Sequence, residues 1–508
     1  MKSKKILLFF LALTLLVSFS PPGRVLAQTG PANDFTGTVT IIHVNDVHTH
    51  VDASETAIGY ARLAGFYEQA KSENPNTILL DAGDTFSGTP NALIDYSNSI
   101  IPILNTVGFD VMVTGNHDYA FGSKQLLKLA GLLDYPVISG NIVYKDSDKP
   151  LFDGYTILTL ANGMKVGVVG LTHFTAQVMG AADVKYTDPV AVGQKLVDEL
   201  EPQVDFIIGL LHIGVGEDGH ANSVTIANEV KGIDVIIDGH THTVLPEGRV
   251  ENGILIAQAG EYGKYIGVVD LTFENGKLVE SKARLISKEE AAGLPEKKAT
   301  AAALASFNAL SKDYLAQVVG ETTVALGESS RDVIRTQETA LGSFYADVMT
   351  KAAGADIGMF NTGVIGGNFG PGKITMADLA TITRTDSLII VKEMTGADVL
   401  AFINYCDVSY PKSSGIFVQV SGIAFMLDPE LEKDKVFNVK VGGNDIDLTK
   451  TYSVALLLGA TDYPGAVNGK MVKEVDFTLN ILKEYMAEHP VISPATDGRI
   501  AAGTKPGS

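Results

Sequence analysis

Short apolar runs alternate with amphipathic segments along the first 290 residues of the chain. Residues 60–71, 124–133 and 189–201 carry apolar side chains at helical spacing, which predicts three helices. Five further runs have the length and composition of buried strands, at residues 39–44, 77–81, 110–114, 205–210 and 234–237. Strands that alternate with helices indicate an α/β sandwich over residues 35–290, with the sheets inside and the helices outside.

The pattern changes near residue 295. Residues 295–318 are rich in Ala and Lys and place apolar residues such as Leu304 and Phe307 at helical spacing, so we expect an exposed helix that connects two domains. Residues 319–503 then form a second, smaller domain. The length alone would suggest about three domains, but the order of the motifs favours two.

The N-terminus has the pattern of a secretory signal peptide. Three lysines within the first five residues precede an apolar stretch at 6–17, and Val25-Leu26-Ala27 offers a small residue for cleavage after position 27. The stretch is too short to span a membrane, and no later segment is long and apolar enough to do so. We therefore expect residues 1–27 to be removed and the protein to be exported, to the periplasm or out of the cell.

Removal of that peptide would make the chain more acidic. The sequence has 39 basic and 59 acidic residues, and without residues 1–27 the net charge would be −24. Such acidity argues against nucleic acid as a partner, and nothing in the sequence indicates an obligate protein partner. Cys406 is the only cysteine, so no intrachain disulfide can form and stability must come from large apolar cores.

Five polar clusters carry the candidate chemistry, and each directly follows one of the predicted strands. A single cluster of this kind could have a purely structural role. We expect such a role for His43, which belongs to none of the clusters and lies inside the first apolar run. Imidazole and oxygen ligands suit divalent metals, and strand ends converge at one edge of a sheet. Together the clusters therefore predict a site for two metal ions. They are Asn45-Asp46-Val47-His48, Gly83-Asp84, Gly115-Asn116-His117-Asp118, Leu211-His212 and Gly239-His240-Thr241-His242.

The order and wording of these clusters resemble the calcineurin-like metallophosphoesterases and, within them, the 5′-nucleotidase family. The likeness covers residues 41–243, from IIHVNDVHTH to IDGHTHT. It implies an N-terminal metallophosphoesterase α/β sandwich with a dinuclear metal site, in which the Asp84 carboxylate is shared by both ions. The ligands implied for one metal are Asp46, His48, Asp84 and His242, and those for the other are Asp84, Asn116, His212 and His240.

Such a pair of metals has a defined chemical use. A bridging carboxylate holds two cations about 3.5–4 Å apart, so that they contact both the attacking and the leaving oxygen of a phosphoryl transfer. The cations also lower the pKa of a bound water, which makes hydroxide available near neutral pH. The ligand types admit Zn, Mn or Fe and leave the choice open.

His117 directly follows Asn116, and the resemblance makes it a catalytic residue that faces the phosphoryl group rather than a ligand. An imidazole can stabilise charge there or protonate the leaving oxygen. Many relatives place an acidic residue three positions later to orient this imidazole, whereas this chain has Ala120. Asp118, beside the histidine, is the candidate substitute and is predicted as a second catalytic residue.

Residues 319–503 resemble the substrate-binding domain of 5′-nucleotidases, which grips the nucleoside and rotates between open and closed arrangements. Segments such as ETALGSFYADVMTKAAGADIGMFNTG and EMTGADVLAFI carry this likeness and imply a C-terminal α+β domain. Six residues are predicted to bind substrate, namely Arg331, Arg335, Asn361, Gly363, Asp462 and Tyr463.

The match is incomplete where the family binds the base. Gly366 stands where the family has an arginine, and Thr385 stands where a stacking aromatic ring is expected. Tyr463 corresponds only loosely to a second aromatic position. The sequence therefore predicts a substrate-binding half whose base clamp has been rebuilt or lost.

These observations predict an exported, metal-dependent phosphoric ester hydrolase that removes phosphate from nucleotides or related small phosphate esters. A 2′,3′-cyclic nucleotide phosphodiesterase and a nucleotide-sugar diphosphate hydrolase remain alternatives, because the same metals can activate water for either reaction. A non-catalytic surface binding protein is the alternative from another class, and the complete set of seven ligands argues against it.

Overall fold

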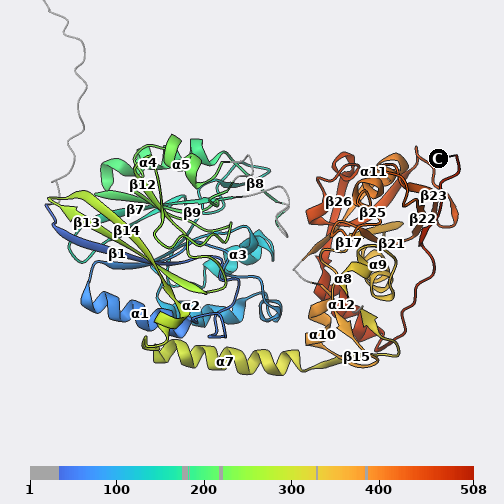
Figure 1. Ribbon diagram of the computed structural model, residues 1–508, viewed down its shortest axis with the longest axis horizontal. Coiled ribbons are helices and arrows are strands. Elements are labelled where there is room, and N and C mark those ends of the chain that lie inside the picture. The colour runs from blue at the N-terminus through green and yellow to red at the C-terminus, as the bar shows by residue number, and fades with distance from the viewer. Residues whose placement is uncertain are drawn as a thin grey trace, which may run out of the picture.

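The computed structural model describes residues 34–173, 181, 183–216, 221–327, 330–383 and 387–507 (Figure 1). The predicted signal peptide and Thr385 lie outside these residues. The chain forms an N-terminal domain, blue to green in Figure 1, and a C-terminal domain, orange to red. The two lie side by side, and helix α7 (Lys298–Leu315) runs along the N-terminal domain toward the C-terminal one.

Two six-stranded sheets form the centre of the N-terminal domain. The first has the order β14 (Lys277–Ser287), β13 (Tyr265–Glu274), β1 (Gly37–Val44), β2 (Thr77–Asp81), β3 (Val111–Val113) and β4 (Val137–Ile138). The second has the order β11 (Arg249–Glu251), β12 (Ile254–Ala257), β10 (Val235–Ile237), β9 (Phe206–His212), β7 (Lys165–Thr172) and β6 (Tyr155–Thr159). Strands β1–β4 are parallel to one another, as are β7, β9, β10 and β12. The short pair β5 (Ile142–Tyr144) and β8 (Val184–Tyr186) lies apart.

The inner faces of the two sheets pack against each other and form one apolar core. Val39 and Ile41 of β1 meet residues such as Val168 and Ile208 of the second sheet there. His43 continues the same face of β1 and is buried opposite Gly267, as we expected from the sequence. The parallel strands of both sheets are thus fixed relative to each other, which is what a site built from their ends requires.

Helices cover the outer faces, which confirms the predicted α/β sandwich. Helices α1 (Tyr60–Glu73), α2 (Ile101–Val107) and α3 (Ser123–Ala130) pack on the first sheet, and α4 (Pro189–Leu200) and α5 (Ser223–Glu229) on the second (Figure 1). Local sequence fixes their starts. The Asp188 side chain accepts a hydrogen bond from the Val190 amide ahead of a proline at the first position of α4, and Asn222 forms a capping box at α5.

Helix α7 is not exposed on all sides, in contrast to our expectation. Leu304 and Phe307 are buried with the apolar residues of α1 and α2, and Thr300 donates a hydrogen bond to the Thr106 carbonyl. Near its end, the Tyr314 hydroxyl accepts a hydrogen bond from Lys483 of the C-terminal domain at 3.0 Å. The apolar stripe of α7 thus makes most of the helix a part of the N-terminal core, and its last turn contacts the C-terminal domain. The short helix α6 (Lys288–Ala291) precedes it.

The C-terminal domain is built on a mixed five-stranded sheet with helices on both faces. Its order is β21 (Val418–Ser421), β17 (Ile357–Asn361), β25 (Thr451–Leu457), β20 (Leu388–Thr395) and β26 (Lys470–Phe477). Helices α9 (Ala340–Ala353), α10 (Met376–Ile382) and α12 (Thr478–Glu488) share one core with it, and α11 (Gly396–Cys406) shares the other. The second core also contains residues of a four-stranded sheet, β24 (Asn444–Asp445), β23 (Val436–Val441), β22 (Ile423–Leu427) and β28 (Ile500–Ala502).

Smaller elements complete this domain and one aromatic cluster joins it to the other. The remaining elements are β15 (Val318–Thr322), β19 (Gly372–Thr375), β27 (Val491–Ile492), β16 (Leu326–Gly327), β18 (Asn368–Phe369) and helix α8 (Arg331–Ile334). Phe477 of β26 lies 6.0 Å from Tyr96 and 6.1 Å from Phe121 of the N-terminal domain, measured between ring centroids. In the described part of the chain, no helix combines the length and apolarity that crossing a membrane requires.

Candidate metal centre

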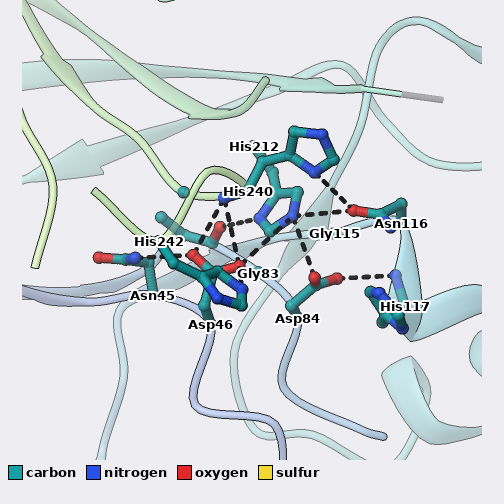
Figure 2. A network of polar contacts seen from close by, with 12 residues as sticks. Asn45, Asp46, Gly83, Asp84, Gly115, Asn116, His117, His212, His240 and His242 are labelled. Atoms are coloured by element: carbon teal, nitrogen blue, oxygen red, sulfur yellow. Dashed lines mark hydrogen bonds and ion pairs between the residues drawn. The ribbon is translucent and has the colours of Figure 1, made fainter. Parts of the chain in front are cut away.

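The five polar clusters meet at the carboxyl ends of β1, β2, β3, β9 and β10. The first three strands belong to one sheet and the last two to the other, so the site spans the edge of the whole sandwich (Figure 2). Each loop contributes side chains to a common point, as the strand ends predict. The residues gathered there include all seven predicted ligands, namely Asp46, His48, Asp84, Asn116, His212, His240 and His242.

The backbone at this site is strained. Asp46, His48, Asp84, His240 and His242 all have positive φ angles, between 49° and 79°. Non-glycine residues seldom adopt this left-handed conformation, which costs about 1–3 kcal/mol per residue and persists only where surrounding contacts enforce it. The cost is concentrated on residues with ligand-type side chains, so the fold sacrifices local stability to aim them inward.

Asp84 lies between two histidines that come from different sheets. Its Oδ2 is 3.3 Å from His212 Nε2 and 3.5 Å from His48 Nε2, while its Oδ1 accepts the backbone N–H of His117 at 2.7 Å. Donor atoms that bind one cation with bonds of about 2.1 Å lie about 3–3.5 Å apart. The Asp84 carboxylate is therefore within reach of a cation on either side.

Asn116 and His240 form the part of the site next to His212. The Asn116 Oδ1 is 3.2 Å from His212 Nε2 and 2.8 Å from His240 Nδ1. On the other side, the Asp46 Oδ1 is 3.3 Å from His242 Nε2 and 4.0 Å from His48 Nε2. The same Asp46 oxygen is 3.8 Å from His212 Nε2, so Asp46 also borders the group of Asp84 and His212.

Three of the histidines are oriented through their second ring nitrogen. His48 Nδ1 donates to the Ser87 carbonyl at 3.0 Å and His212 Nδ1 donates to the Ala82 carbonyl at 2.7 Å. His242 Nδ1 lies 2.6 Å from the Glu261 carboxylate. Since these oxygens can only accept, each Nδ1 carries a proton, and each Nε2 is the nitrogen that faces the centre of the site and can bind a metal ion once it is deprotonated. The donor set thus fits divalent metal ions.

The electrostatic field at the site favours positive charge. Burial opposes protonation of His212, but the carboxylates of Asp84 and Asp46 outweigh it and raise the pKa of this imidazole to about 10. His240 has its pKa lowered to about 3 by burial and by the neighbouring His212. Carboxylates that stabilise a proton on a buried imidazole also stabilise a cation in its place.

Two glycines allow the loops to approach this closely. A Cβ on Gly83, whose φ is +87°, would lie 2.6 Å from the backbone nitrogen of Gly115. A Cβ on Gly115 would lie 2.1 Å from Asp84 Oδ1. A larger residue at Gly115 would displace the Asp84 carboxylate, and one at Gly83 would press on the Gly115 backbone, so the glycines that precede Asp84 and Asn116 are part of the site.

His117 and Asp118 occupy different environments although they are adjacent. The His117 ring lies at the site, 5.0 Å from the His48 ring, and no residue in the described ranges hydrogen-bonds its imidazole. The Asp118 carboxylate is buried and accepts the backbone N–H groups of Asp84, Thr85, Phe86 and Gly115 at 2.7–3.0 Å. Asp118 therefore braces the loops that carry the predicted ligands, and no hydrogen bond among the described residues joins its oxygens to the His117 ring. Ala120 is fully buried.

The predicted substrate-binding residues gather at one end of the C-terminal sheet. Arg331 Nη2 donates to the carbonyls of Gly363 and Ile365, both at 3.2 Å. Asn361, at the end of β17, donates to the Ile416 carbonyl at 2.9 Å. The Nε of Arg335 is buried without a hydrogen-bond partner among the described residues.

Asp462 and Tyr463 follow β25 in the chain, and Tyr463 lies beside the end of α11. The Tyr463 ring stacks on Phe402 at 5.9 Å and lies 5.1 Å from Tyr405, which is 39% exposed. Asp462 is exposed and raises the pKa of nearby Lys392, although burial lowers it overall. The sequence analysis did not identify Tyr405, because no motif surrounds it. Its place beside Tyr463 depends on where α11 ends in the fold.

Two other contributors to the metal centre lacked a sequence signal. The buried Asp238 accepts the backbone N–H groups of Ile213 and Gly214 at 3.0 and 3.1 Å, so it braces the loop after β9 as Asp118 braces the loop after β2. Glu261 follows β12 and contacts His242. Both are acidic residues next to strand ends, and only the fold distinguishes them from surface carboxylates.

Comparison with known proteins agrees with this geometry. Residues 39–244 match the calcineurin-like phosphoesterase model, and residues 318–462 match the 5′-nucleotidase C-terminal domain. The chain is 29% identical to the trifunctional nucleotide phosphoesterase YfkN of Bacillus subtilis over 92% of its own length, but it spans only 35% of that protein. It is 26% identical to a 5′-nucleotidase of Vibrio parahaemolyticus, with 90% of both chains covered.

A solved structure shares the two-domain arrangement. The 5′-nucleotidase precursor from Thermus thermophilus superimposes with a TM-score of 0.61 at 27% identity, covering 92% of this chain and all of that one. The two domain matches occur in the same order as the two lobes, and the ligand groups lie within the first. The chain therefore belongs to the calcineurin-like metallophosphoesterases of the 5′-nucleotidase family, metal-dependent phosphoester hydrolases that use two divalent metal ions.

Proposed function

We propose that the protein is an exported hydrolase that removes phosphate from nucleotides by means of two divalent cations. One observation carries this proposal. Seven donor side chains from five strand ends meet at one point, and three of their imidazoles are already locked with Nε2 facing inward. A protein that only binds a partner has no need of such an arrangement, whereas a phosphoryl-transfer site depends on it.

The distances support a division of the ligands into two sets. Asp46, His48 and His242 would hold one cation, and Asn116, His212 and His240 would hold the other. Asp84 would serve both, because its Oδ2 lies between His48 and His212. When bound, the two cations supply positive charge to the phosphoryl oxygens and lower the pKa of the attacking water.

His117 is the residue we assign to the phosphoryl group itself. Its backbone N–H is fixed by Asp84, and its ring stands beside His48 without being held by another side chain in the described ranges. A positioned imidazole there can donate a hydrogen bond to a non-bridging oxygen or a proton to the leaving oxygen. We assign Asp118 a supporting role, since its carboxylate is already occupied by four backbone N–H groups.

The C-terminal domain would bind the nucleoside part of the substrate. Arg331 and Arg335 bring positive charge to an otherwise acidic chain, and Tyr463 with Tyr405 offers aromatic surface on the same sheet end. Asn361, Gly363 and Asp462 line the same end in this proposal. Binding energy from this remote part of the substrate would be used to hold the phosphate at the metals.

A second candidate is hydrolysis of phosphodiesters such as 2′,3′-cyclic nucleotides or nucleotide sugars. It is favoured by the relative at 29% identity, which is described as a trifunctional nucleotide phosphoesterase. The proposed pair of cations can activate water for either reaction, because both are in-line attacks of water on phosphorus.

The test is phosphate release from AMP and from a generic aryl phosphate by purified protein that has been treated with a chelator. We expect little turnover until Mn²⁺ or Zn²⁺ is restored. The same metal treatment with a cyclic nucleotide and a nucleotide sugar ranks the second candidate, with chromatography of the monoester products as the readout because neither cleavage releases free phosphate. Cleavage that is unaffected by the chelator, or no cleavage of any of these esters with either metal, would refute the proposal.

Export is proposed from the N-terminal sequence alone. Mass spectrometry of the protein recovered from the periplasm or the medium should give a chain that begins at Gln28. A chain that keeps residues 1–27 and stays inside the cell would contradict it.

A further inference from the structure

The loop after β12 closes the metal centre on the side of His242. Strand β12 pairs in parallel with β10, so its carboxyl end lies beside the loop that carries His240 and His242. It is thus another parallel strand end at the same edge, although it supplies none of the predicted ligands. Residues 259–264 lie in the loop that joins β12 to β13 at this edge.

This loop is fastened to the ligand loop of β1 by backbone and amide contacts. Asn45 Nδ2 donates to the Gly260 carbonyl at 2.7 Å, and the Ala259 N–H donates to Asn45 Oδ1 at 2.8 Å. The Tyr262 N–H donates to the Asp46 carbonyl at 2.8 Å. The loop and the Asp46 backbone therefore form one rigid unit.

Two side chains of the loop touch the ligands. The Glu261 carboxylate lies 2.6 Å from His242 Nδ1, and Lys264 Nζ lies 2.7 Å from the other oxygen of the same carboxylate. The Tyr262 ring meets His48 and His242 edge-on, with centroids 5.7 and 5.8 Å away. Tyr262 has a φ of +55°, so the backbone accepts strain to place it there.

His242 differs from the other oriented histidines in the kind of partner that holds it. His48 and His212 donate to backbone carbonyls, which mutation cannot remove, and both rings are almost completely buried. His242 is held by a charged side chain, and 33% of its own side chain is exposed. Without that partner it is the imidazole most free to turn away.

We propose that Glu261 is a positioning residue for one of the two cations. It fixes His242 with the proton on Nδ1 and with Nε2 directed at the point shared with Asp46 and His48, and Lys264 holds the carboxylate in place. This inference rests on the ligand sets of the proposed function. It adds that the two cations depend on different supports, so that one can be weakened without the other.

The experiment measures cation binding directly in the full-length mature protein. Mn²⁺ is titrated by calorimetry into wild type, Glu261→Ala and Glu261→Gln, and electron paramagnetic resonance distinguishes coupled Mn²⁺ pairs from single ions. We expect Glu261→Ala to weaken one of two binding events about 10–100-fold, the usual effect of losing a carboxylate behind a ligating histidine. The coupled-pair signal should fade at Mn²⁺ levels that saturate wild type.

Control variants separate positioning from a general loss of structure. Glu261→Gln keeps an acceptor for His242 and should fall between wild type and Glu261→Ala, while Glu280→Gln, which removes an exposed carboxylate on β14, should leave both binding events unchanged. Two events of wild-type affinity in Glu261→Ala would overturn the inference, as would equal weakening of both in a protein with an unchanged circular dichroism spectrum. If wild type binds no Mn²⁺ or Zn²⁺ at all, the proposed function fails as well, whereas unequal binding without phosphoester cleavage leaves this inference standing.

Discussion

The metal end of the N-terminal domain, where the seven predicted ligands meet, and the proposed binding end of the C-terminal domain, where the six predicted substrate-binding residues lie, are organised in opposite ways. At the metal end, most of the ligands are buried, and carboxylates such as Asp118 satisfy the backbone of the loops behind them. At the binding end, Arg331 donates hydrogen bonds to carbonyls of its own domain, and the Tyr463 ring stacks on the Phe402 ring. The first is a dense polar network supported from behind, and the second is a set of separate groups on a surface.

This difference indicates which part of the reaction each end controls. Preorganised charge in a buried site lowers the barrier for phosphoryl transfer, because little reorganisation is left for the moment of reaction. Separate groups on an exposed surface contribute binding energy in small amounts and tolerate replacement. We therefore expect substitutions at the metal end to abolish chemistry and those at the binding end to change affinity gradually.

Loss of the shared carboxylate should have the largest effect. In Asp84→Asn the charge between His48 and His212 disappears, so both cations should bind less tightly and turnover should fall below detection. Metal analysis and phosphate release from AMP check this, with Asp146→Asn, an exposed carboxylate, as the control. Two bound metals together with near-normal activity would remove Asp84 from the centre of the comparison.

His117→Asn should have the next largest effect and a different signature. In the described ranges the ring meets His48 edge-on but makes no hydrogen bond that holds the ligand loops, so metal content and stability should stay near normal. The rate should fall by about 10²–10⁴, the usual contribution of a positioned acid or charge stabiliser. If this variant lost a metal instead, His117 would be a ligand, and its assignment to the phosphoryl group would be wrong.

The sequence was sufficient for much of the metal end. Ligand-type residues at strand ends form a pattern because the chemistry tolerates few alternatives, and the strands themselves follow from buried apolar runs. Thus the predicted strand at 77–81 coincides with β2 and the ligands after it converge as expected. The sequence analysis missed Asp238 and Glu261 at this end. Asp238 acts through backbone N–H groups and Glu261 through the neighbouring His242, and such roles depend on contacts between residues far apart in sequence.

The binding end was less predictable for a physical reason. Arg331 and Tyr463 could be nominated from the family pattern, but Tyr405 is placed by the end of α11 and has no local signature. The position of helix α7 was also mispredicted, because it too depends on contacts between distant parts of the chain. Its composition suggested an exposed connection, whereas Leu304 and Phe307 make it part of the N-terminal core.

Arg335→Ala tests how gradually the binding end responds. Its buried Nε has no hydrogen-bond partner in the described ranges, and we expect the guanidinium to gain one when an anionic or polar group of the substrate binds. A hydrogen bond to a charged group contributes about 1.5–3 kcal/mol, so kcat/KM for AMP should fall about tenfold or more, mainly through KM. A generic aryl phosphate should be affected less. Arg284→Ala, an exposed arginine on β14, is the control, and a fall in kcat with unchanged KM would place Arg335 in the chemical step.

The smallest effect should come from the identity of the base. Gly366 contributes no side chain to the binding end, and the aromatic surface that the described residues place there includes Tyr463 and the 39% exposed Tyr405. Stacking on such rings contributes about 1–3 kcal/mol per base whatever the base is, because every base has a π-face. We therefore expect AMP, GMP, UMP and CMP to have kcat/KM values within about tenfold, or about 1.4 kcal/mol, of one another. Tyr405→Ala and Tyr463→Ala should lower all four alike and leave ribose 5-phosphate unchanged. A preference of a hundredfold or more for one base would mean that this end is as closely organised as the metal end, and the contrast between the two would not hold.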